Sequence, residues 1–215
     1  MIRLVIVDDE PMVIAHLRTI LGAAEDIDVV GDAQDGAEAV EAVLRFGPDV
    51  VLMDLRMPGV DGLTAIERIS ALPGPPAVVA LTTFDADGHI LRALRAGAAG
   101  FVVKSIPPQD LLGVVRVAAQ GQTVLSPLVA RRLVAASADG RERGADARKR
   151  TGTLTGRETE VLACLGEGLS NADIAGRLYL SEATVKSYVS RMLDKLGCAN
   201  RTQAGLLARE AGLVP

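Results

Sequence analysis

The stretch that decides the fold is VVLMD at residues 50–54, in which four apolar residues end at the carboxylate of Asp54. Three other apolar runs also end at polar side chains: LVIV at 4–7 before Asp8 and Asp9, VVAL at 78–81 before Thr82, and FVV at 101–103 before Lys104. Continuous apolar runs of this length are typical of strands buried on both faces, and therefore of a parallel sheet. Open parallel sheets place their functional sites outside the carboxyl ends of the strands. The sequence therefore predicts that these polar side chains share one crevice.

Helices are predicted between these strands and after the last one, near Pro11–Ala24, Gly36–Phe46, Gly62–Leu72, Ala86–Ala96 and Pro108–Gln120. Ile27–Val30 is predicted as a shorter strand at the sheet edge. Pro58-Gly59 and Asp61-Gly62 are turn-forming pairs that could also shape the loop after Asp54. Five strand–helix units in this order predict an α/β doubly wound fold with a five-stranded parallel sheet over residues 1–120.

The composition fits a cytoplasmic protein with a packed core. Hydrophobic residues make up 49% of the 215 residues and charged residues 23%, which argues against global disorder. The start, MIRLVIVDDE, is too short and too acidic for a signal peptide, and no apolar run approaches membrane-spanning length. Cys164 and Cys198 fit no metal-binding spacing and are expected to be reduced. His16 and His89 have no ligand-like partner nearby in the sequence, so surface or capping roles are expected.

Charge is distributed unevenly along the chain. Residues 1–125 hold 9 basic and 17 acidic residues, residues 126–152 hold 7 and 3, and residues 153–215 hold 7 and 7. An acidic first part, a basic hinge and a neutral tail indicate separate modules. The acidic part is not expected to contact nucleic acid.

Residues 121–152 are predicted to connect two domains. Ser126-Pro127 has the form of a helix N-cap followed by proline at the first helical position, and a helix through about Ala136 is expected. Ser137–Gly152 has no apolar period and many Gly, Ala and Arg residues, so it is predicted to be a flexible linker. Its basic residues could contact DNA phosphates, but a solvated linker is the favoured interpretation.

Residues 153–215 are predicted to form a small all-α domain of four helices. An N-cap residue precedes each helix: Thr155, Ser170, Ser181 and Asn200. Thr155 with Glu158 fits a capping box, and the other three are serviceable N-caps. Gly168, Gly197 and Gly212 are expected near helix ends. A unit this small needs a core that all four helices share.

The strand-end side chains suit the transfer of a phosphoryl group to a carboxylate. A carboxylate can act as a nucleophile and form an acyl phosphate, but its attack on an anionic phosphoryl group needs positive charge nearby. Mg²⁺, which prefers oxygen ligands, would supply part of that charge. Lys104 would offset charge on the phosphoryl oxygens, and Thr82 would donate a hydrogen bond to one of them. Taken singly, each residue has an ordinary alternative: a helix cap for Asp8 or Asp9, a strand end for Thr82, and a solvated charge for Lys104.

Residues 1–125 resemble the CheY-like receiver domain of two-component response regulators, which has a flavodoxin-like fold. The resemblance rests on Asp8-Asp9, on Asp54 in DLRMPGVDG, on Thr82 in LTTFD and on Lys104 in FVVKSIPP. It implies that Asp54 is the phosphorylation site. It also implies that Asp9, Asp54 and a backbone carbonyl near Arg56 bind Mg²⁺, and that Asp8 binds the ion through water.

The same resemblance implies that Phe101 is a switch residue, which turns inward when Thr82 is drawn toward the phosphate. The alternative for Phe101 is plain core packing on a buried strand. Phe101 has no hydroxyl group to satisfy outside, so it could prefer the inward rotamer even without phosphate.

Residues 154–212 resemble the LuxR-type helix-turn-helix domain. The resemblance is carried by LTGRETEVLACL and by GLSNADIAGRLYLSEATVKSYVSRMLDKLGCANRTQA. A receiver followed by this domain resembles the NarL/FixJ class of response regulators. It implies binding to double-stranded DNA, a sensor histidine kinase as phosphoryl donor, and a homodimer on activation.

The predicted helix after Ser181 has two faces. At ~100° per residue its apolar residues fall on one side: Val185, Val189, Met192 and Leu196. A helix that carries small polar residues and arginine outward can enter the major groove. The predicted DNA-contacting residues are Thr184, Lys186, Ser187, Ser190, Arg191 and Lys195. A simple solvated face is the alternative, and the preceding predicted helix and tight turn favour DNA contact.

The last predicted helix, Asn200–Ala211, has apolar residues at three- and four-residue spacing: Ala204, Leu207, Ala208 and Ala211. By resemblance this stripe is a candidate dimer surface, although core packing explains part of it.

The sequence as a whole predicts a phosphorylation-controlled transcription regulator. It is not expected to be an enzyme beyond Mg²⁺-dependent self-phosphorylation and self-dephosphorylation of Asp54. The first alternative is a DNA-binding regulator that does not use phosphate and whose receiver is only an interaction module, against which the complete set of strand-end residues argues. The second is a small-molecule phosphatase or phosphotransferase, for which no substrate-pocket motif is visible.

Overall fold

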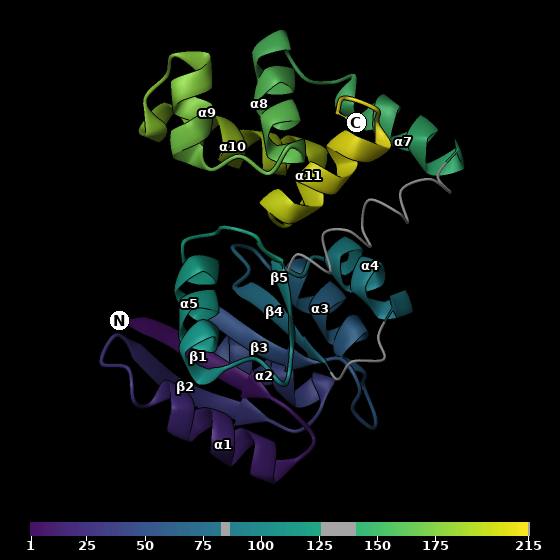
Figure 1. Cartoon of the computed structure of the whole chain (residues 1–215). Coiled ribbons are helices and arrows are strands. Elements are labelled where there is room, and N and C mark those ends of the chain that lie inside the picture. Colours follow the sequence, from purple (N-terminus) through teal and green to yellow (C-terminus); the bar gives the residue numbers. More distant parts are fainter. Residues whose placement is uncertain (83–86, 126–140, 215) are drawn as a thin grey trace. The chain divides into compact units, whose positions relative to one another are not determined.

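The computed structural model describes residues 1–82, 87–125 and 141–214 (Figure 1). The chain divides into two compact units, Met1–Ala130 and Arg131–Pro215. The first unit alternates strands and helices, and the second is helical throughout its described residues.

The first unit is built on one parallel sheet. Its strands are β1 (Ile2–Val7), β2 (Ile27–Ala33), β3 (Val50–Asp54), β4 (Ala77–Thr82), β5 (Gly100–Val103) and β6 (Val124–Leu125). They lie in the order β2-β1-β3-β4-β5-β6. The predicted doubly wound fold with five main parallel strands is confirmed, and β2 lies at the sheet edge as expected. The sixth strand was not predicted, because two residues are too few to show a pattern.

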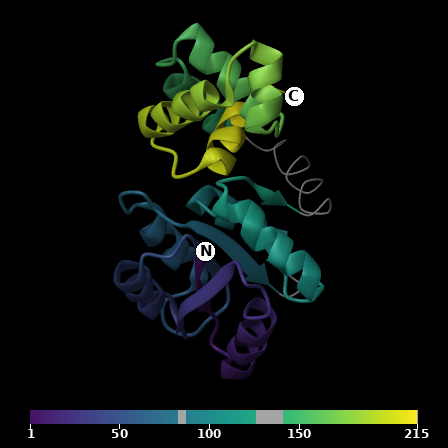
Figure 2. The ribbon, with the colours of Figure 1, turned by 90° about the vertical axis from the view of Figure 1, so that its left-hand side faces the viewer.

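Helices cover both faces of this sheet. They are α1 (Pro11–Leu21), α2 (Gly36–Phe46), α3 (Gly62–Ser70), α4 (Asp87–Ala96) and α5 (Pro108–Ala119). Figures 1 and 2 show α1 and α5 on one face of the sheet, with α2 and α3 on the other. Two of these helices have side-chain N-caps, because Asp35 and Asp61 accept hydrogen bonds from backbone N–H groups in the first turns of α2 and α3. Both α1 and α5 begin at a proline.

The core lies between the sheet and its helices. Every residue of Leu4–Val7 and of Val50–Met53 has no exposed surface. Burial of one such Leu, Ile or Val side chain contributes about 1.5–3 kcal/mol relative to exposure. The packed strands therefore hold their carboxyl ends in fixed positions, and these ends carry the polar residues singled out above.

The second unit contains the four predicted helices, α8 (Gly156–Gly166), α9 (Asn171–Leu178), α10 (Glu182–Leu196) and α11 (Arg201–Glu210). Each begins after its predicted N-cap, whose side chain accepts a hydrogen bond from the first turn: Thr155, Ser170, Ser181 and Asn200. The capping box expected at Thr155 is present, and a second one pairs Ser170 with Asp173. The four helices enclose one shared core.

A fifth helix, α7 (Arg141–Thr151), precedes them and packs against α11 (Figure 1). Ala147 is 1% exposed in the core of the unit, and the Arg150 guanidinium donates a hydrogen bond to the carbonyl of Leu196 at the end of α10. The flexible linker predicted over Ser137–Gly152 is therefore wrong for these eleven residues. The helix predicted to follow Ser126-Pro127 and the start of that linker lie outside the described residues.

Candidate functional site

The four central strands of the first unit bring the predicted side chains to one end of the sheet. Asp8 and Asp9 follow β1, Asp54 ends β3, Thr82 ends β4, and Lys104 follows β5. Because these strands are parallel neighbours, their carboxyl ends meet. Carboxylate oxygens of Asp8, Asp9 and Asp54 lie within 4.8 Å of one another. The predicted crevice therefore exists, and it concentrates negative charge.

Lys104 provides the positive charge of this crevice. Its Nζ lies 2.7 Å from Asp54 Oδ2 and 2.7 Å from Asp8 Oδ2. Burial alone would lower the pKa of the ammonium, but the hydrogen bonds and charges of Asp54 and Asp8 outweigh burial and raise that pKa above its usual value. Lys104 therefore stays charged at neutral pH and holds two carboxylates together.

Asp8 is the most deeply buried of the acidic residues, with no exposed surface. Burial raises the pKa of its carboxyl, and Lys104 and the Glu10 N–H, which donates to Oδ1 at 3.1 Å, oppose that rise. Its Oδ2 forms the ion pair with Lys104, but no further partner among the described residues satisfies that oxygen. A buried carboxylate that is only partly compensated is costly. This arrangement fits a site that a cation completes.

The donor set of the crevice suits a hard cation such as Mg²⁺, because three carboxylates offer oxygen ligands at one place. The residues that would hold the ion are Asp8, Asp9 and Asp54. Arg56 lies in the loop after β3, where its backbone N–H donates to Asp54 Oδ1 at 3.2 Å. The role predicted for the Arg56 carbonyl stays a prediction.

Gly62 allows α3 to begin close to the backbone of Asp54, whereas in the sequence it was recognised only as part of a turn-forming pair. It is the first residue of α3, and its N–H donates to the carbonyl of Leu55 at 3.3 Å. A Cβ atom at Gly62 would lie 2.0 Å from the carbonyl oxygen of Asp54 and 2.8 Å from Leu55 Cα. The start of α3 therefore rests directly on the backbone of Asp54, and only glycine permits this approach.

In the second unit, α10 has the two faces that the sequence predicted. Val185, Met192 and Leu196 are buried in the core. Four of the residues predicted to contact DNA are exposed: Ser187, Ser190 and Arg191 on the opposite side, and Lys186 at the margin between the two faces. The Arg191 guanidinium lies 5.0 Å from the ring centre of Tyr188, and its Nε donates to the carbonyl of Ser187 at 3.3 Å. These contacts lay it along the exposed surface of the helix.

The other two predicted DNA-contacting residues have partners within the unit. Thr184 belongs to the start of α10, because its N–H and its hydroxyl both contact the hydroxyl of Ser181. Lys195 is exposed, and its Nζ lies 3.0 Å from Glu158 Oε2. Thr184 and Lys195 therefore also stabilise the unit itself.

Two families match this chain. Residues 4–116 match the response regulator receiver domain, and residues 152–208 match the luxR family of bacterial regulatory proteins. This chain belongs to the response regulators.

The similarity of this response regulator to known proteins covers nearly its whole length. It is 36% identical over 214 residues to the uncharacterized transcriptional regulatory protein YxjL of Bacillus subtilis, covering 99% of this chain and 97% of YxjL. Among solved structures it resembles the response regulator ChrA of a heme-sensing two-component system, with 39% identity, a TM-score of 0.54, and 99% and 98% of the two chains covered. It also resembles RcsB, solved as two dimers bound to two parallel DNAs, with 26% identity, a TM-score of 0.56 and 96% of each chain covered.

The response regulator is therefore a transcription regulator of a two-component system, as predicted, with a receiver and a LuxR-type DNA-binding domain. None of the described helices is long and apolar enough to cross a membrane.

The predicted switch residues of the response regulator lie on adjacent strands. Thr82 is 3% exposed, and its carbonyl accepts a hydrogen bond from the Lys104 N–H at 2.7 Å. Phe101 is 2% exposed and pairs in register with Ala80 of β4. Phe101 thus occupies the inward position that its lack of a hydroxyl favours. Its movement during switching stays a prediction.

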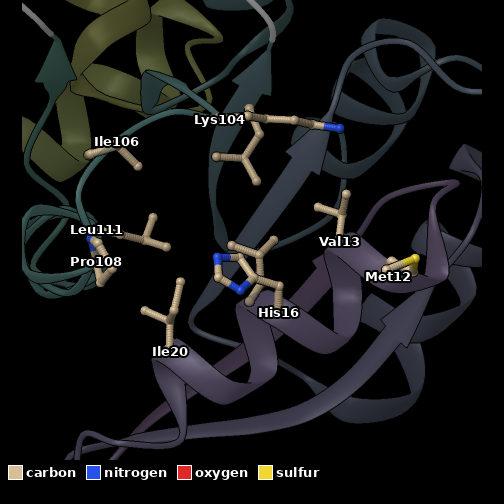
Figure 3. Close-up of a pocket in the computed structure, with 10 residues that line it drawn as sticks. Met12, Val13, His16, Ile20, Lys104, Ile106, Pro108 and Leu111 are labelled. Atoms are coloured by element: carbon tan, nitrogen blue, oxygen red, sulfur yellow. The ribbon is translucent and has the colours of Figure 1, made fainter.

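A pocket of about 320 Å³ lies between α1 and α5 of the response regulator. Figure 3 shows His16 and Ile20 of α1 facing Leu111 of α5 across it. Its lining is mainly apolar, and Lys104 is the lining residue that links it to the crevice. Such a lining suits apolar groups better than phosphorylated metabolites, so the pocket does not support a small-molecule phosphotransferase.

The apolar stripe of α11 has a different role from the one considered above. Ala204, Leu207, Ala208 and Ala211 are all buried in the core of the second unit. Core packing explains the whole stripe, so these four side chains cannot form a dimer surface while the unit is folded.

Proposed function

We propose that this response regulator accepts a phosphoryl group on Asp54 from a sensor histidine kinase in the cytoplasm. The observation that carries the proposal is the position of Lys104, whose Nζ lies 2.7 Å from Asp54 Oδ2 while two further carboxylates adjoin. In this arrangement an oxygen of Asp54 attacks phosphorus, the bond from phosphorus to the donor nitrogen breaks, and an acyl phosphate forms. The imidazole of the donor histidine leaves with the electron pair of that bond.

Several residues around Asp54 stabilise the negative charge of the added phosphoryl group. The Lys104 ammonium shifts from the carboxylate toward the phosphoryl oxygens, and the hydroxyl of Thr82 donates a hydrogen bond to one of them. Asp8, Asp9, Asp54 and the Arg56 carbonyl would hold Mg²⁺, with Asp8 acting through water, and the ion would supply further positive charge to the site. Attack of water on phosphorus later returns the Asp54 carboxylate and releases inorganic phosphate, which ends the signal.

Phosphorylation then shifts a conformational equilibrium of the receiver. Thr82 ends β4 and Phe101 lies on the neighbouring β5, so a displacement of Thr82 reaches the face formed by α4, β5 and α5. We expect this shift to favour a homodimer that binds double-stranded DNA. The dimers on DNA in the RcsB structure support such an assembly for this family.

On DNA, the exposed face of α10 enters the major groove. Lys186 and Arg191 contact phosphate or guanine, and Ser187 and Ser190 contact base edges. Thr184 and Lys195 lie at the two ends of the contact. Alanine at Lys186 or Arg191 should weaken binding by ~1–3 kcal/mol where the side chain grips a base with two hydrogen bonds.

Labelling by a small phosphodonor tests the proposed acceptor. With Mg²⁺ and acetyl phosphate, the intact mass of the full chain should rise by one phosphoryl group, and Asp54→Asn should abolish the rise. Asp28→Asn is the matched control, because Asp28 is an exposed carboxylate on β2, away from the crevice. Equal labelling of Asp54→Asn and the wild type would reject the assignment.

A further inference from the structure

Tyr179 has an unusual backbone conformation for its residue type. It caps the C-terminus of α9 in the left-handed region, with φ 54° and ψ 48°. Among the described residues it is the one residue other than glycine with positive φ. The N–H of Tyr179 and the N–H of Leu180 both donate to the carbonyl of Ala175. Glycine is the usual residue at such a cap, because a Cβ atom is unfavourable there.

The side chain of Tyr179 does not compensate for this strain within the chain. It is 95% exposed, and no hydrogen bond or cation contact reaches it from the described residues. The left-handed caps of α2 and α10 are the glycines Gly47 and Gly197, as expected. A strained, exposed aromatic residue contributes little to folding, and strain that persists in this way is a pointer to function.

The turn that carries Tyr179 is held firmly from both sides. Arg157 of α8 donates from Nη2 to the carbonyl of Leu178 at 2.5 Å. On the other side, Ser181 caps α10 by accepting a hydrogen bond from the Thr184 N–H at 3.1 Å. The backbone of Tyr179 is therefore fixed two residues before the N-cap of the helix that we assign to the major groove.

In a helix-turn-helix pair, the first residues of the second helix approach the bases while the first helix crosses the sugar–phosphate backbone. The turn between the two helices consequently lies beside the phosphates at the groove edge. Tyrosine hydroxyls are common donors to phosphate oxygens in protein–DNA complexes. We infer that Tyr179 donates its phenolic O–H to a DNA phosphate next to the groove that α10 enters. This inference rests on the proposed use of α10.

Such a contact has a signature that a charged contact lacks. A lysine or arginine at a phosphate releases counterions, so its loss reduces the dependence of binding on salt. The Tyr179 hydroxyl is neutral and releases none. Its loss should therefore weaken binding by the same factor at every salt concentration.

Two substitutions separate a role in DNA binding from a role in folding. Tyr179→Phe removes only the hydroxyl, and it should leave the melting temperature unchanged while weakening binding about 3- to 10-fold. Tyr179→Gly also removes the backbone strain, so it should weaken binding at least as much while raising the melting temperature by about 4 °C. A purely structural role would move affinity and melting temperature in the same direction.

The experiment uses the full chain with Mg²⁺ and acetyl phosphate, and fluorescence anisotropy on a labelled mixed-sequence 30-bp duplex at several salt concentrations. Arg191→Ala is the charged comparison; it should weaken binding, and where Arg191 contacts a phosphate it should also reduce the salt slope by about one. The inference is overturned if Tyr179→Phe binds the duplex as tightly as the wild type does. It is also overturned if Tyr179→Gly loses affinity and its melting temperature falls as well. If the wild type itself does not bind the duplex, the proposed function fails along with the inference. If Arg191→Ala weakens binding and neither Tyr179 variant does, only the inference fails.

Discussion

Gly62→Ala should damage both folding and phosphorylation, because α3 begins against the backbone of the phosphoacceptor. The new Cβ atom would lie 2.0 Å from the Asp54 carbonyl oxygen and 2.8 Å from Leu55 Cα. Side-chain carbon atoms do not approach other heavy atoms closer than about 3 Å, so α3 and the end of β3 must separate by about 1 Å. Both groups in the clash are backbone, and neither can rotate away.

The expected loss of stability follows from this displacement. Overpacking of a filled site costs about 1–3 kcal/mol. The hydrogen bond from the Gly62 N–H to Leu55, 3.3 Å long, would lengthen as well, at a cost of about 1 kcal/mol. Alanine offers little compensating helix propensity at the first helical position. We therefore expect the free energy of unfolding to fall by ~2–4 kcal/mol.

The displacement should also slow phosphorylation. Asp54 Oδ2 lies 2.7 Å from Lys104 Nζ, and a shift of about 1 Å would break that hydrogen bond. A misplacement of this size can reduce a rate about 100-fold. Urea denaturation followed by circular dichroism measures the first effect, and the rate of labelling by acetyl phosphate measures the second.

Gly113→Ala is the matched control for both measurements. Gly113 lies inside α5, where a Cβ atom would meet nothing within 4 Å. This substitution should stabilise the fold by about 0.5–1 kcal/mol through helix propensity, with unchanged labelling. Wild-type stability and a wild-type labelling rate in Gly62→Ala would refute the argument that α3 positions Asp54.

Three further predictions concern buried charge, pH and α7. Asp8→Asn should raise the melting temperature, because burial raises the pKa of the Asp8 carboxyl and makes its charged form costly in the folded state. The same substitution should lower Mg²⁺-dependent labelling. A lower melting temperature would contradict this prediction. The pKa of Glu158 falls from 4.5 to about 2 through hydrogen bonds from the Thr155 backbone, the Lys195 ammonium and the Thr155 hydroxyl. The ionised Glu158 carboxylate should stabilise the folded state fully above pH 4.5, and this contribution should be lost as the pH falls through 2. The difference in unfolding free energy between the wild type and Glu158→Gln should therefore shrink over that range. A difference independent of pH would contradict the assignment. Brief trypsin digestion should spare Arg148, Lys149 and Arg150 in α7, and Ala147→Asp should expose them; cleavage there in the wild type would show that α7 is not docked.

The strands and the crevice could be predicted because their signal is local. Four apolar residues that end at Asp54 identify both a buried strand and the end of it, and parallel pairing brings such ends together. The N-caps of the second unit are equally local, since each depends on one side chain and the three residues after it.

Features that depend on contacts between residues far apart in the chain could not be predicted from the sequence. The close approach of Gly62 to the Asp54 carbonyl depends on how α3 packs on β3, which no spacing reveals. The buried side chains of α7 include Ala147 and, one turn later, Thr151. Two small side chains among many arginines do not form a recognisable apolar stripe in the sequence, so the helix was not predicted. The stripe on α11 was visible, but only the assembled core shows that the other helices cover it.

Control of DNA binding by phosphate on Asp54 can be checked by one affinity measurement. Duplexes selected from random sequence by the phosphorylated protein would be prepared with one half-site and with two half-sites whose centres are ~10 bp apart. Acetyl phosphate with Mg²⁺ should tighten binding of the wild type, far more on the paired duplex than on the single one, and should leave Asp54→Asn unaffected. Equal affinity with and without the phosphodonor, or the same tightening in Asp54→Asn, would contradict the account.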